Sequence, residues 1–172
     1  MGFTSNSGTM IREVLGDGLV GAEIGVCHGD NCAHMLGMPN FIKTLLAVDP
    51  WVPYPGASWG KELQEDHYQN VMKMAGGDPR LIVMRRPSVE AAALVADGAL
   101  DFVYIDGAHD YENVKADIQA WMPKLRAGGV MSGHDYGDPG PAKDVKIAVD
   151  EVFPKLDGVG IPGDAGTWWV KI

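Results

Sequence analysis

The sequence predicts an α/β fold: a doubly wound, seven-stranded, mostly parallel sheet that closes with a C-terminal antiparallel hairpin. Two observations lead to this expectation. Short apolar runs alternate with stretches of helical periodicity along the 172 residues, and strands that alternate with helices form parallel sheets covered by helices on both faces. Only five residues separate the last two apolar runs, 158–161 and 167–172. Because that is too few for a crossover helix, these two runs must pair antiparallel.

The first half of the chain is expected to supply three parallel strands. Apolar residues at helical spacing predict a first helix that ends at Gly16 and Gly18. The compact apolar runs after it predict buried strands, and the amphipathic stretches between them predict helices. The expected strands span residues 19–26, 44–48 and 80–84, and the expected helices span residues 30–38 and 59–74.

Two side chains in the second half are of the kind that cap helix N-termini. Ser88 precedes an alanine-rich helical pattern over residues 89–96, and Asp110 follows a fourth expected strand at 101–105. The helix after Asp110 is expected to turn an apolar face toward the core, formed by Tyr111, Val114, Ile118 and Trp121.

Prolines and glycines delimit the remaining elements. Pro123 is expected to end the preceding helix, with Lys124 and Arg126 in its last turn. A fifth strand is expected at residues 130–132, and Pro141 suits the first turn of the last helix.

The composition limits the partners of the chain. With 14 basic and 23 acidic residues, the net charge is −9, which disfavours nucleic acid and anionic membranes and favours a small neutral or cationic partner. No apolar run approaches the roughly 18 residues of a membrane span, and the first residues lack a signal-peptide pattern. We therefore expect no membrane contact, a cytoplasmic location, and reduced thiols at Cys27 and Cys32 that pack in the fold. A single domain is expected over residues 1–172, and a homo-oligomer stays open.

The stretch after the second strand is rich in proline and glycine and carries Trp51, Tyr54 and Trp59. Two interpretations stay open for it. It is an ordinary loop with partly buried aromatic side chains, or it belongs to a lid over residues 51–78 that excludes water and stacks on a substrate.

The residues that follow each strand are the candidates for chemistry, because ligands of an open parallel sheet bind beyond the carboxyl ends of its strands. After the first strand, Gly25 and Gly29 allow a ligand to approach the backbone, and the helix behind them offers free N–H groups. Asp49 follows at the distance from Gly25 at which an acidic side chain meets ribose hydroxyls in nucleotide-binding folds. Glycine-rich turns also occur without ligands, but together with Asp49 they favour a nucleoside ligand.

The spacing also distinguishes between nucleoside ligands. The dinucleotide fingerprint has a third glycine and a pyrophosphate over the helix. Here Glu23 lies two residues before Gly25, where its carboxylate would repel a pyrophosphate and suits a cationic amino group. The pattern acid-x-Gly-x-x-x-Gly over residues 23–29 resembles the first motif of class I S-adenosylmethionine-dependent methyltransferases, whose Rossmann-like fold also ends in an antiparallel hairpin.

Two longer stretches extend the resemblance. Residues 101–112, DFVYIDGAHDYE, and residues 121–136, WMPKLRAGGVMSGHDY, resemble methyltransferase family 24 and, more distantly, the metal-dependent catechol and macrolide-sugar O-methyltransferases. The resemblance runs from about residue 20 to residue 172. It implies S-adenosyl-L-methionine as the cofactor and methyl transfer to a hydroxyl group of a small sugar-like or phenol-like molecule.

The resemblance also implies which residues contact the cofactor. Glu23, Gly25 and Gly29 would hold its methionine part, and Asp49 its ribose hydroxyls. The remaining implied contacts are Pro50 and Trp51 beside the ribose, Ser88 at the adenine, and Asp106 at the end of the fourth strand.

A metal site is implied beside the cofactor. Asp106 looks like the first metal ligand, and His134 with Asp135 ends the fifth strand where the catechol enzymes carry an acidic or Asp-Asn pair. Carboxylate oxygens suit Mg²⁺, while an imidazole favours softer ions such as Mn²⁺ or Zn²⁺. His109 stands where the catechol enzymes place a catalytic lysine. With an ordinary pKa of about 6.5 it would be a neutral general base next to Asp106.

Three alternatives to a methyltransferase stay open at this point. A metal-dependent hydrolase could use the same histidines and aspartates, but it would not need Glu23 and Asp49 at their spacing. A nicotinamide-dependent oxidoreductase or epimerase is opposed by the missing third glycine and by the closing hairpin. A non-catalytic nucleoside-binding module would have no need of the polar residues after the fourth and fifth strands.

Overall fold

The computed structural model describes residues 7–53, 60–137, 140, 142–161 and 164–172. Five of the strands pair in parallel, in the spatial order third, second, first, fourth, fifth, and the last two strands complete a seven-stranded sheet. The strands are β1 (Leu19–Ile24), β2 (Ile42–Asp49), β3 (Leu81–Arg85), β4 (Leu100–Ile105), β5 (Leu125–Gly133), β6 (Gly158–Ile161) and β7 (Asp164–Lys171).

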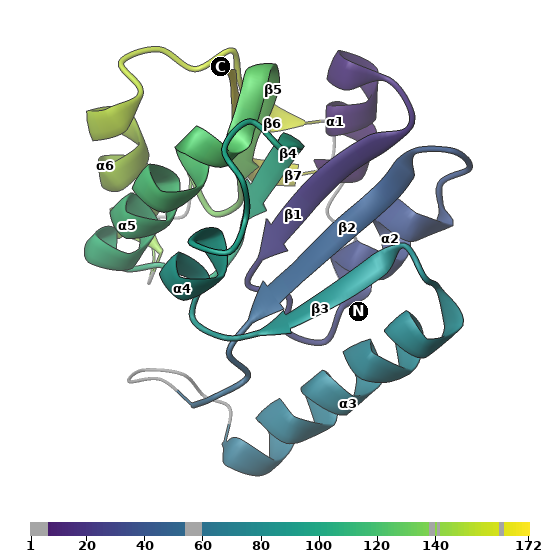
Figure 1. Ribbon diagram of the computed structural model, residues 1–172. Helices are drawn as coiled ribbons and strands as arrows, with labels where there is room; N and C mark the ends of the chain where they lie inside the picture. Colours follow the sequence, from purple (N-terminus) through teal and green to yellow (C-terminus); the bar gives the residue numbers. More distant parts are fainter. Residues whose placement is uncertain (1–6, 54–59, 138–139, 141, 162–163) are drawn as a thin grey trace.

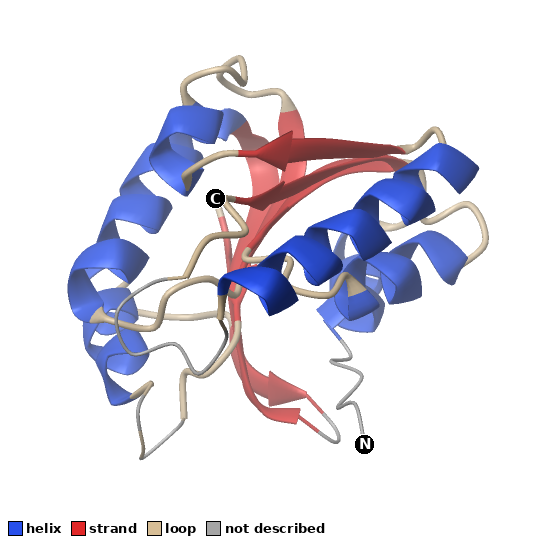
Figure 2. Ribbon diagram, turned by 90° about the horizontal axis from the view of Figure 1, so that it is seen from below, coloured by secondary structure: helices blue, strands red, loops and turns tan. Residues whose placement is uncertain are grey.

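The terminal hairpin is antiparallel, as predicted. β7 lies between β5 and β6 and runs antiparallel to both, so that the sheet order is β3-β2-β1-β4-β5-β7-β6. Helices cover both faces of the sheet, which confirms the predicted doubly wound fold class (Figures 1 and 2).

The helices form two layers. They are α1 (Ser7–Leu15), α2 (Asp30–Gly37), α3 (Lys61–Gly77), α4 (Ser88–Ala92), α5 (Tyr111–Trp121) and α6 (Lys143–Val152), with a short 3₁₀ turn, η1, over Met122–Lys124. The first three pack on one face of the sheet and the last three on the other. No helix among these described residues is long and apolar enough to cross a membrane.

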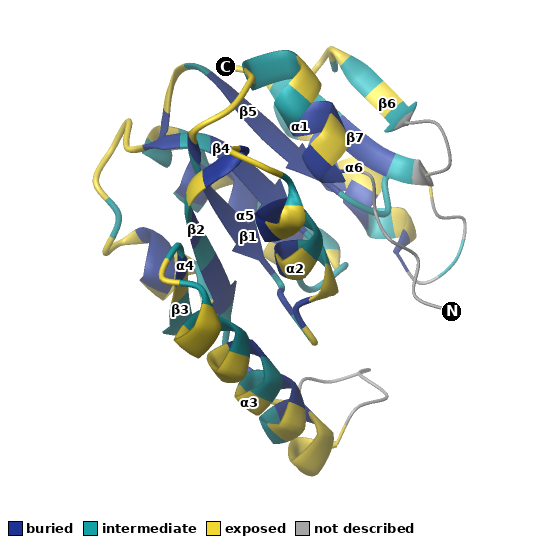
Figure 3. Ribbon diagram, turned by 90° about the vertical axis from the view of Figure 1, so that its right-hand side faces the viewer, coloured by how far each residue is buried: buried dark blue, intermediate teal, exposed yellow. Residues whose placement is uncertain are grey.

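The core lies on both sides of the sheet because strand side chains alternate in direction. In β4, Phe102 packs with the layer of α1 to α3, whereas Val103 packs with α4 to α6. Figure 3 shows the sheet as a buried centre with exposed residues on the outer helix surfaces. On α5, Ile118 and Trp121 are fully buried, whereas Tyr111, expected on the same face, is only half-buried.

One of the two predicted helix caps is confirmed. The Asp110 carboxylate accepts a hydrogen bond from the Asn113 N–H at 3.1 Å and caps α5. The expectation for Ser88 is wrong, because the N-cap position of α4 is Pro87. The Ser88 hydroxyl instead accepts a hydrogen bond from the Trp121 indole at 2.9 Å. Ser88 therefore pairs with a side chain far away in the sequence and not with the backbone at the start of α4.

The fifth strand is longer than predicted. β5 begins at Leu125 rather than at residue 130, so Arg126 lies in the sheet and not in a helix. Its guanidinium pairs with the Asp101 carboxylate on the neighbouring strand at 2.6 Å. Pro141 lies outside the described residues.

The middle of the sheet positions the candidate site. From β1 the chain first moves outward to β2 and β3, and it then crosses to β4 on the other side of β1. The connections after β1 and β4 therefore lead away in opposite directions, which leaves a crevice beyond the carboxyl ends of these two strands. Glu23 lies next to the last residue of β1, and Asp106 follows β4 directly.

Candidate active site

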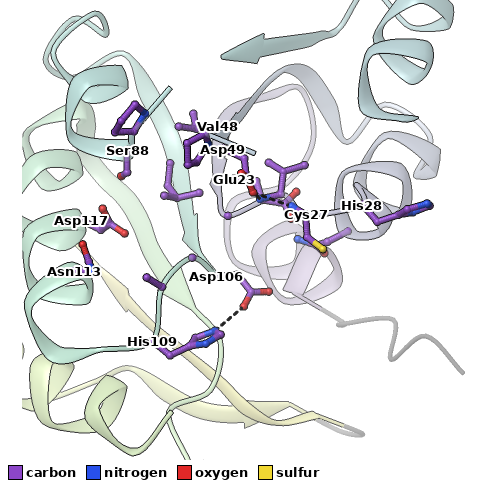
Figure 4. Close-up of a pocket in the computed structure, with 18 of the residues that line it drawn as sticks. Glu23, Cys27, His28, Val48, Asp49, Ser88, Asp106, His109, Asn113 and Asp117 are labelled. Carbon is purple, nitrogen blue, oxygen red and sulfur yellow. Dashed lines mark hydrogen bonds and ion pairs between the residues drawn. The ribbon is translucent and has the colours of Figure 1, made fainter. Parts of the chain in front are cut away.

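A pocket of about 650 Å³ fills this crevice. Its walls come from the turn after β1, the end of β2, the start of α4, the turn after β4 and the inner face of α5 (Figure 4). Seven of the predicted site residues line it: Glu23, Gly25, Asp49, Pro50, Ser88, Asp106 and His109. The lining does not include Gly29, Trp51, His134 or Asp135.

Gly25 and Gly29 are required by the packing of the chain on itself. Both have positive φ angles, +86° and +95°, which favour glycine. A side-chain carbon on Gly25 would lie 2.2 Å from the Asp106 carbonyl oxygen, and one on Gly29 would meet Val71 at 3.0 Å and Met74 at 3.1 Å. The packing of protein atoms is therefore by itself a sufficient reason for glycine at both positions, and the contact with a ligand stays a prediction. Gly25 nevertheless exposes its backbone to the pocket.

Asp49 organises the two loops that form the floor of the pocket. Its Oδ2 accepts hydrogen bonds from the N–H groups of Val26 and Cys27, both at 3.0 Å. Its Oδ1 accepts one from the Trp51 N–H at 2.6 Å. Burial raises the pKa of this carboxyl, and the backbone donors oppose that effect. Since a carboxylate can accept about four hydrogen bonds, Asp49 keeps capacity for a ligand in the pocket.

Trp51 supports this floor from the core. Its side chain is 2% exposed, its indole N–H donates to the Cys27 carbonyl at 2.9 Å, and its ring packs against Tyr68 of α3. The Trp51 side chain thus faces the core and does not line the pocket, and the predicted place of Trp51 beside the ribose stays a prediction. α3, which makes up most of the possible lid over residues 51–78, packs on the fold through its buried Val71 and contributes Gln64 to the lining of the pocket; the lid itself stays a prediction. Tyr54 and Trp59 lie outside the described residues.

Glu23 is a buried acid at the bottom of the pocket. It is 2% exposed, and its Oε2 accepts a hydrogen bond from the Cys32 thiol at 2.7 Å. Burial raises the pKa of Glu23 to about 8. Burial therefore favours the neutral carboxylic acid form of Glu23 as long as no cation lies beside it. A cationic group brought next to it would favour the ionised form.

A second buried acid, Asp117, was not identified from the sequence. It is 6% exposed and lines the pocket together with Asn113 and Ser88, on the side opposite Cys27 (Figure 4). Burial raises the pKa of Asp117 to about 6, and a hydrogen bond with Ser88 opposes that rise. The sequence contained a signal for it, because Asp117 falls at helical spacing on the apolar face of α5.

The four residues predicted for metal binding and base catalysis lie together at one rim. One ligand atom each of Asp106, His134 and Asp135 falls within 4.8 Å of the other two. His109 Nε2 lies 2.9 Å from Asp135 Oδ2 and 3.8 Å from Asp106 Oδ1. His134 Nδ1 lies 3.2 Å from Asp135 Oδ1. The positive φ of Asp135, 61°, turns its side chain into this cluster at a cost in backbone strain.

The charge state of His109 differs from the prediction. The carboxylates of Asp106 and Asp135 raise its pKa to about 10. Burial raises the pKa of Asp135, but His109 and His134 outweigh it and hold that pKa below the ordinary value. The two carboxylates therefore favour the imidazolium form of His109 in this arrangement, whereas the sequence led us to expect an ordinary pKa; its role as a general base stays a prediction. In the free protein, His109 can act as a proton donor or as the counter-ion of Asp106 and Asp135.

The same cluster fits a divalent cation. Two carboxylates and an imidazole are a donor set for Mn²⁺ or Zn²⁺ more than for Mg²⁺, and their ligand atoms are close enough to share one ion. The positive charge of His109 now lies against Asp135, where a cation would otherwise be held. An ion at this place would therefore compete with the His109 proton.

The chain belongs to the methyltransferase domain family known as methyltransferase family 24, whose pattern matches residues 22–136. The resemblance inferred from the motifs is thereby confirmed. The match contains Glu23, Asp49, Ser88 and Asp106, and thus both the floor of the pocket and its rim.

One curated relative shares part of the chain. The protein y4gI of Sinorhizobium fredii (strain NBRC 101917 / NGR234), described as an uncharacterized protein, is 38% identical over 93 residues. The aligned part is 52% of this chain and 10% of the relative. The match therefore spans about a tenth of the length of that protein.

Solved structures share the fold over nearly the whole chain. A protein from Corynebacterium glutamicum has a TM-score of 0.66 and 17% identity, covering 99% of this chain and 82% of that chain. CalS11, a TDP-rhamnose 3′-O-methyltransferase of calicheamicin biosynthesis, has a TM-score of 0.63 and 19% identity, covering 96% of this chain and 76% of that chain. At these identities the similarity is one of fold.

Proposed function

We propose that the chain is an S-adenosyl-L-methionine-dependent methyltransferase that methylates a hydroxyl group of a small molecule. The observation that carries the proposal is a single cavity that joins Glu23 and Asp49 at its floor to Asp106 and His109 at its rim, in a chain of a methyltransferase family. Such a cavity can hold a nucleoside cofactor at one end and a methyl acceptor at the other.

Side chains of the chain would hold the cofactor at three points. Glu23 would bind the ammonium group of the amino-acid part. Asp49, whose carboxylate already accepts three backbone hydrogen bonds, would accept one from a ribose hydroxyl. Asp117, held by Ser88, would accept a hydrogen bond from the amino group of the adenine at the far side of the pocket. S-adenosylmethionine supplies a methyl group on a positively charged sulfur, which an oxygen nucleophile can accept.

The rim residues would prepare the acceptor. Asp106, His134 and Asp135 would hold a divalent cation, which supplies a positive charge that lowers the pKa of an acceptor hydroxyl. The cation would neutralise the carboxylates of Asp106 and Asp135, which raise the pKa of His109, so that this pKa would fall. The neutral His109 Nε2 could then take the hydroxyl proton. Without an ion, His109 would instead hold the acceptor oxygen by donating a hydrogen bond.

The charge of the pocket favours a neutral or cationic acceptor. Among the described residues, no lysine or arginine lines it. Six acidic side chains do: Glu23, Asp30, Asp49, Asp106, Asp110 and Asp117. A phosphate-bearing acceptor would be repelled. CalS11 is a TDP-rhamnose 3′-O-methyltransferase, and by analogy of fold alone it supports a sugar hydroxyl as the acceptor. Its acceptor carries a diphosphate, so the preference of this chain for a neutral or cationic acceptor rests on the charge of its own pocket.

Incubation with labelled S-adenosylmethionine and a panel of neutral catechols, sugars and amino sugars tests the proposal. We expect label to appear on an oxygen atom of at least one acceptor, as located by NMR of the product. Transfer to nitrogen alone would contradict the proposed reaction. A non-catalytic nucleoside-binding module would bind the cofactor and label nothing in the panel.

The affinity for S-adenosylhomocysteine should rise with pH below about 8, the pKa of Glu23 in the free protein. Binding the ligand's ammonium group favours the Glu23 carboxylate and so expels a proton, which becomes easier as pH rises. The expected rise is at most about tenfold per pH unit between about pH 6 and 7.5. Calorimetric titration over this range measures it.

The control for this pH dependence is Glu23→Gln, which should bind more weakly with a nearly flat profile. Asp30→Asn changes another acid of the pocket, whose side chain is 80% exposed, and should keep the parent profile. A parent affinity that stays constant with pH would show that Glu23 does not meet a cationic group.

Mn²⁺ should bind to the parent protein and displace about one proton at pH 8, because the ion and the His109 proton compete for the same carboxylates. Asp135→Asn should weaken Mn²⁺ binding by roughly tenfold or more and leave S-adenosylhomocysteine binding unchanged. Calorimetry in two buffers with different ionisation enthalpies measures both quantities. Asp150→Asn, which removes a surface partner of Lys146, is the control. Equal Mn²⁺ affinity in all three proteins would exclude the proposed ligand set.

A further inference from the structure

The carboxyl group of Glu23 depends on a thiol that lies behind the pocket. Cys32 is on α2 and does not line the pocket, yet its Sγ lies 2.7 Å from Glu23 Oε2. Cys32 is 0% exposed and Glu23 is 2% exposed. The contact therefore lies in the interior, where a hydrogen bond is not weakened by competition with water.

The other groups that face Glu23 give it little support. The Asn31 side chain of α2 hydrogen-bonds to it, while the negative charges of Asp49 on β2 and Asp106 after β4 oppose its ionisation. No lysine, arginine or histidine forms an ion pair with Glu23 among the described residues. An ionised Glu23 thus relies on a thiol and an amide from the protein until a cationic ligand arrives.

The thiol is available as a donor throughout the physiological pH range. Burial and the adjacent Glu23 carboxylate raise the pKa of Cys32 well above the ordinary value, so the sulfur keeps its proton. A cysteine also suits the apolar neighbours at this place, which include Met35 and Phe41 of the same buried cluster. A buried hydroxyl would be the closest substitute that keeps the donor.

We propose that Cys32 is a positioning residue for the cofactor: its S–H group holds the Glu23 carboxylate in place to receive the ammonium group of the amino-acid part. The proposal rests on the proposed function, because it assumes that Glu23 meets this ammonium group. Cys32 touches neither the cofactor nor the acceptor and acts through Glu23 alone.

Two ligands and two matched variants test the role of Cys32. S-adenosylhomocysteine carries the amino-acid part, whereas 5′-methylthioadenosine keeps the adenosine and the sulfur but lacks that part. Cys32→Val fills the space without a donor, and Cys32→Ser keeps a donor. Calorimetric dissociation constants for both ligands are compared in the parent protein and the two variants.

We expect Cys32→Val to weaken S-adenosylhomocysteine binding by roughly tenfold to a hundredfold, as for the loss of a hydrogen bond to a charged group. Binding of 5′-methylthioadenosine should be unchanged. Cys32→Ser should bind S-adenosylhomocysteine within roughly threefold of the parent. Cys32→Ala replaces Cys32→Val under the same criteria if the valine variant does not fold.

Two results would overturn the inference. Cys32→Val could bind S-adenosylhomocysteine as the parent does, or it could lose affinity for both ligands equally, which is the signature of a packing role. Glu23→Gln separates these failures from a failure of the proposed function. If Glu23→Gln selectively loses S-adenosylhomocysteine and Cys32→Val does not, only the inference on Cys32 fails. If Glu23→Gln also leaves the ratio of the two affinities unchanged, the proposed placement of the cofactor fails.

Discussion

Replacing Gly25 by alanine should destabilise the fold by roughly 2–5 kcal/mol. The positive φ of +86° accounts for part of this cost, and the contact of the new side-chain carbon with the Asp106 carbonyl oxygen, 2.2 Å away, for the rest. The atoms that it would meet belong to the backbone after β4 and cannot rotate away. Urea denaturation followed by circular dichroism measures the loss.

Gly98→Ala is the matched control for this prediction. Gly98 also has a positive φ, +69°, but nothing lies within 4 Å of the place of its added carbon. Gly98→Ala should lower the free energy of unfolding only by the cost of a positive φ for alanine, roughly 1–2 kcal/mol. The difference between the two variants isolates the close approach of the β1 and β4 connections. Equal losses would mean that this contact is not tight in solution.

The second large effect is expected for Asp49→Ala, which should weaken S-adenosylhomocysteine binding by roughly a hundredfold or more. The variant loses the acceptors proposed for the ribose, and it also releases the N–H groups of Val26, Cys27 and Trp51. The floor of the pocket therefore loses its shape together with its charge. Calorimetric titration gives the dissociation constant, and thermal unfolding shows the loss of stability separately.

Asp30→Asn serves as the comparison for Asp49→Ala. Asp30 lines the same pocket, but its side chain is exposed. Its Oδ1 lies 3.3 Å from His28 Nδ1. Its substitution should change the affinity by less than roughly threefold. An Asp49→Ala protein that binds S-adenosylhomocysteine as tightly as the parent would remove Asp49 from the site.

The fold could be predicted from the sequence because its signals are local. The apolar run at residues 101–105 and the short link before β7 act within a few residues. The run predicts a buried strand, and the link predicts an antiparallel pairing. β5 was predicted too short because its first residue, Leu125, is placed in the sheet by pairing with Leu100 on a different strand. Ser88 was assigned to a cap for the same reason, since its actual partner is Trp121.

Most of the predicted site residues line the candidate pocket, but the sequence did not predict the charge state of His109 or the presence of Asp117. Spacing and resemblance placed Glu23, Asp49 and Asp106 around one cavity. The raised pKa of His109 is caused by Asp106, three residues before it, and by Asp135 on another strand end. Only the first of these partners is near His109 in the sequence. Asp117 was missed because a polar residue on an apolar helix face acquires its meaning only from the cavity in front of it.

The most direct test of a methyltransferase cofactor site is calorimetric titration of the purified chain with S-adenosylhomocysteine and with NAD. We expect S-adenosylhomocysteine to bind with a stoichiometry of about one ligand per chain, since one cavity joins the groups proposed to hold it. NAD should not bind measurably, because its pyrophosphate would face Glu23 and Asp49. Binding of NAD in preference to S-adenosylhomocysteine, or binding of neither ligand, would contradict the account.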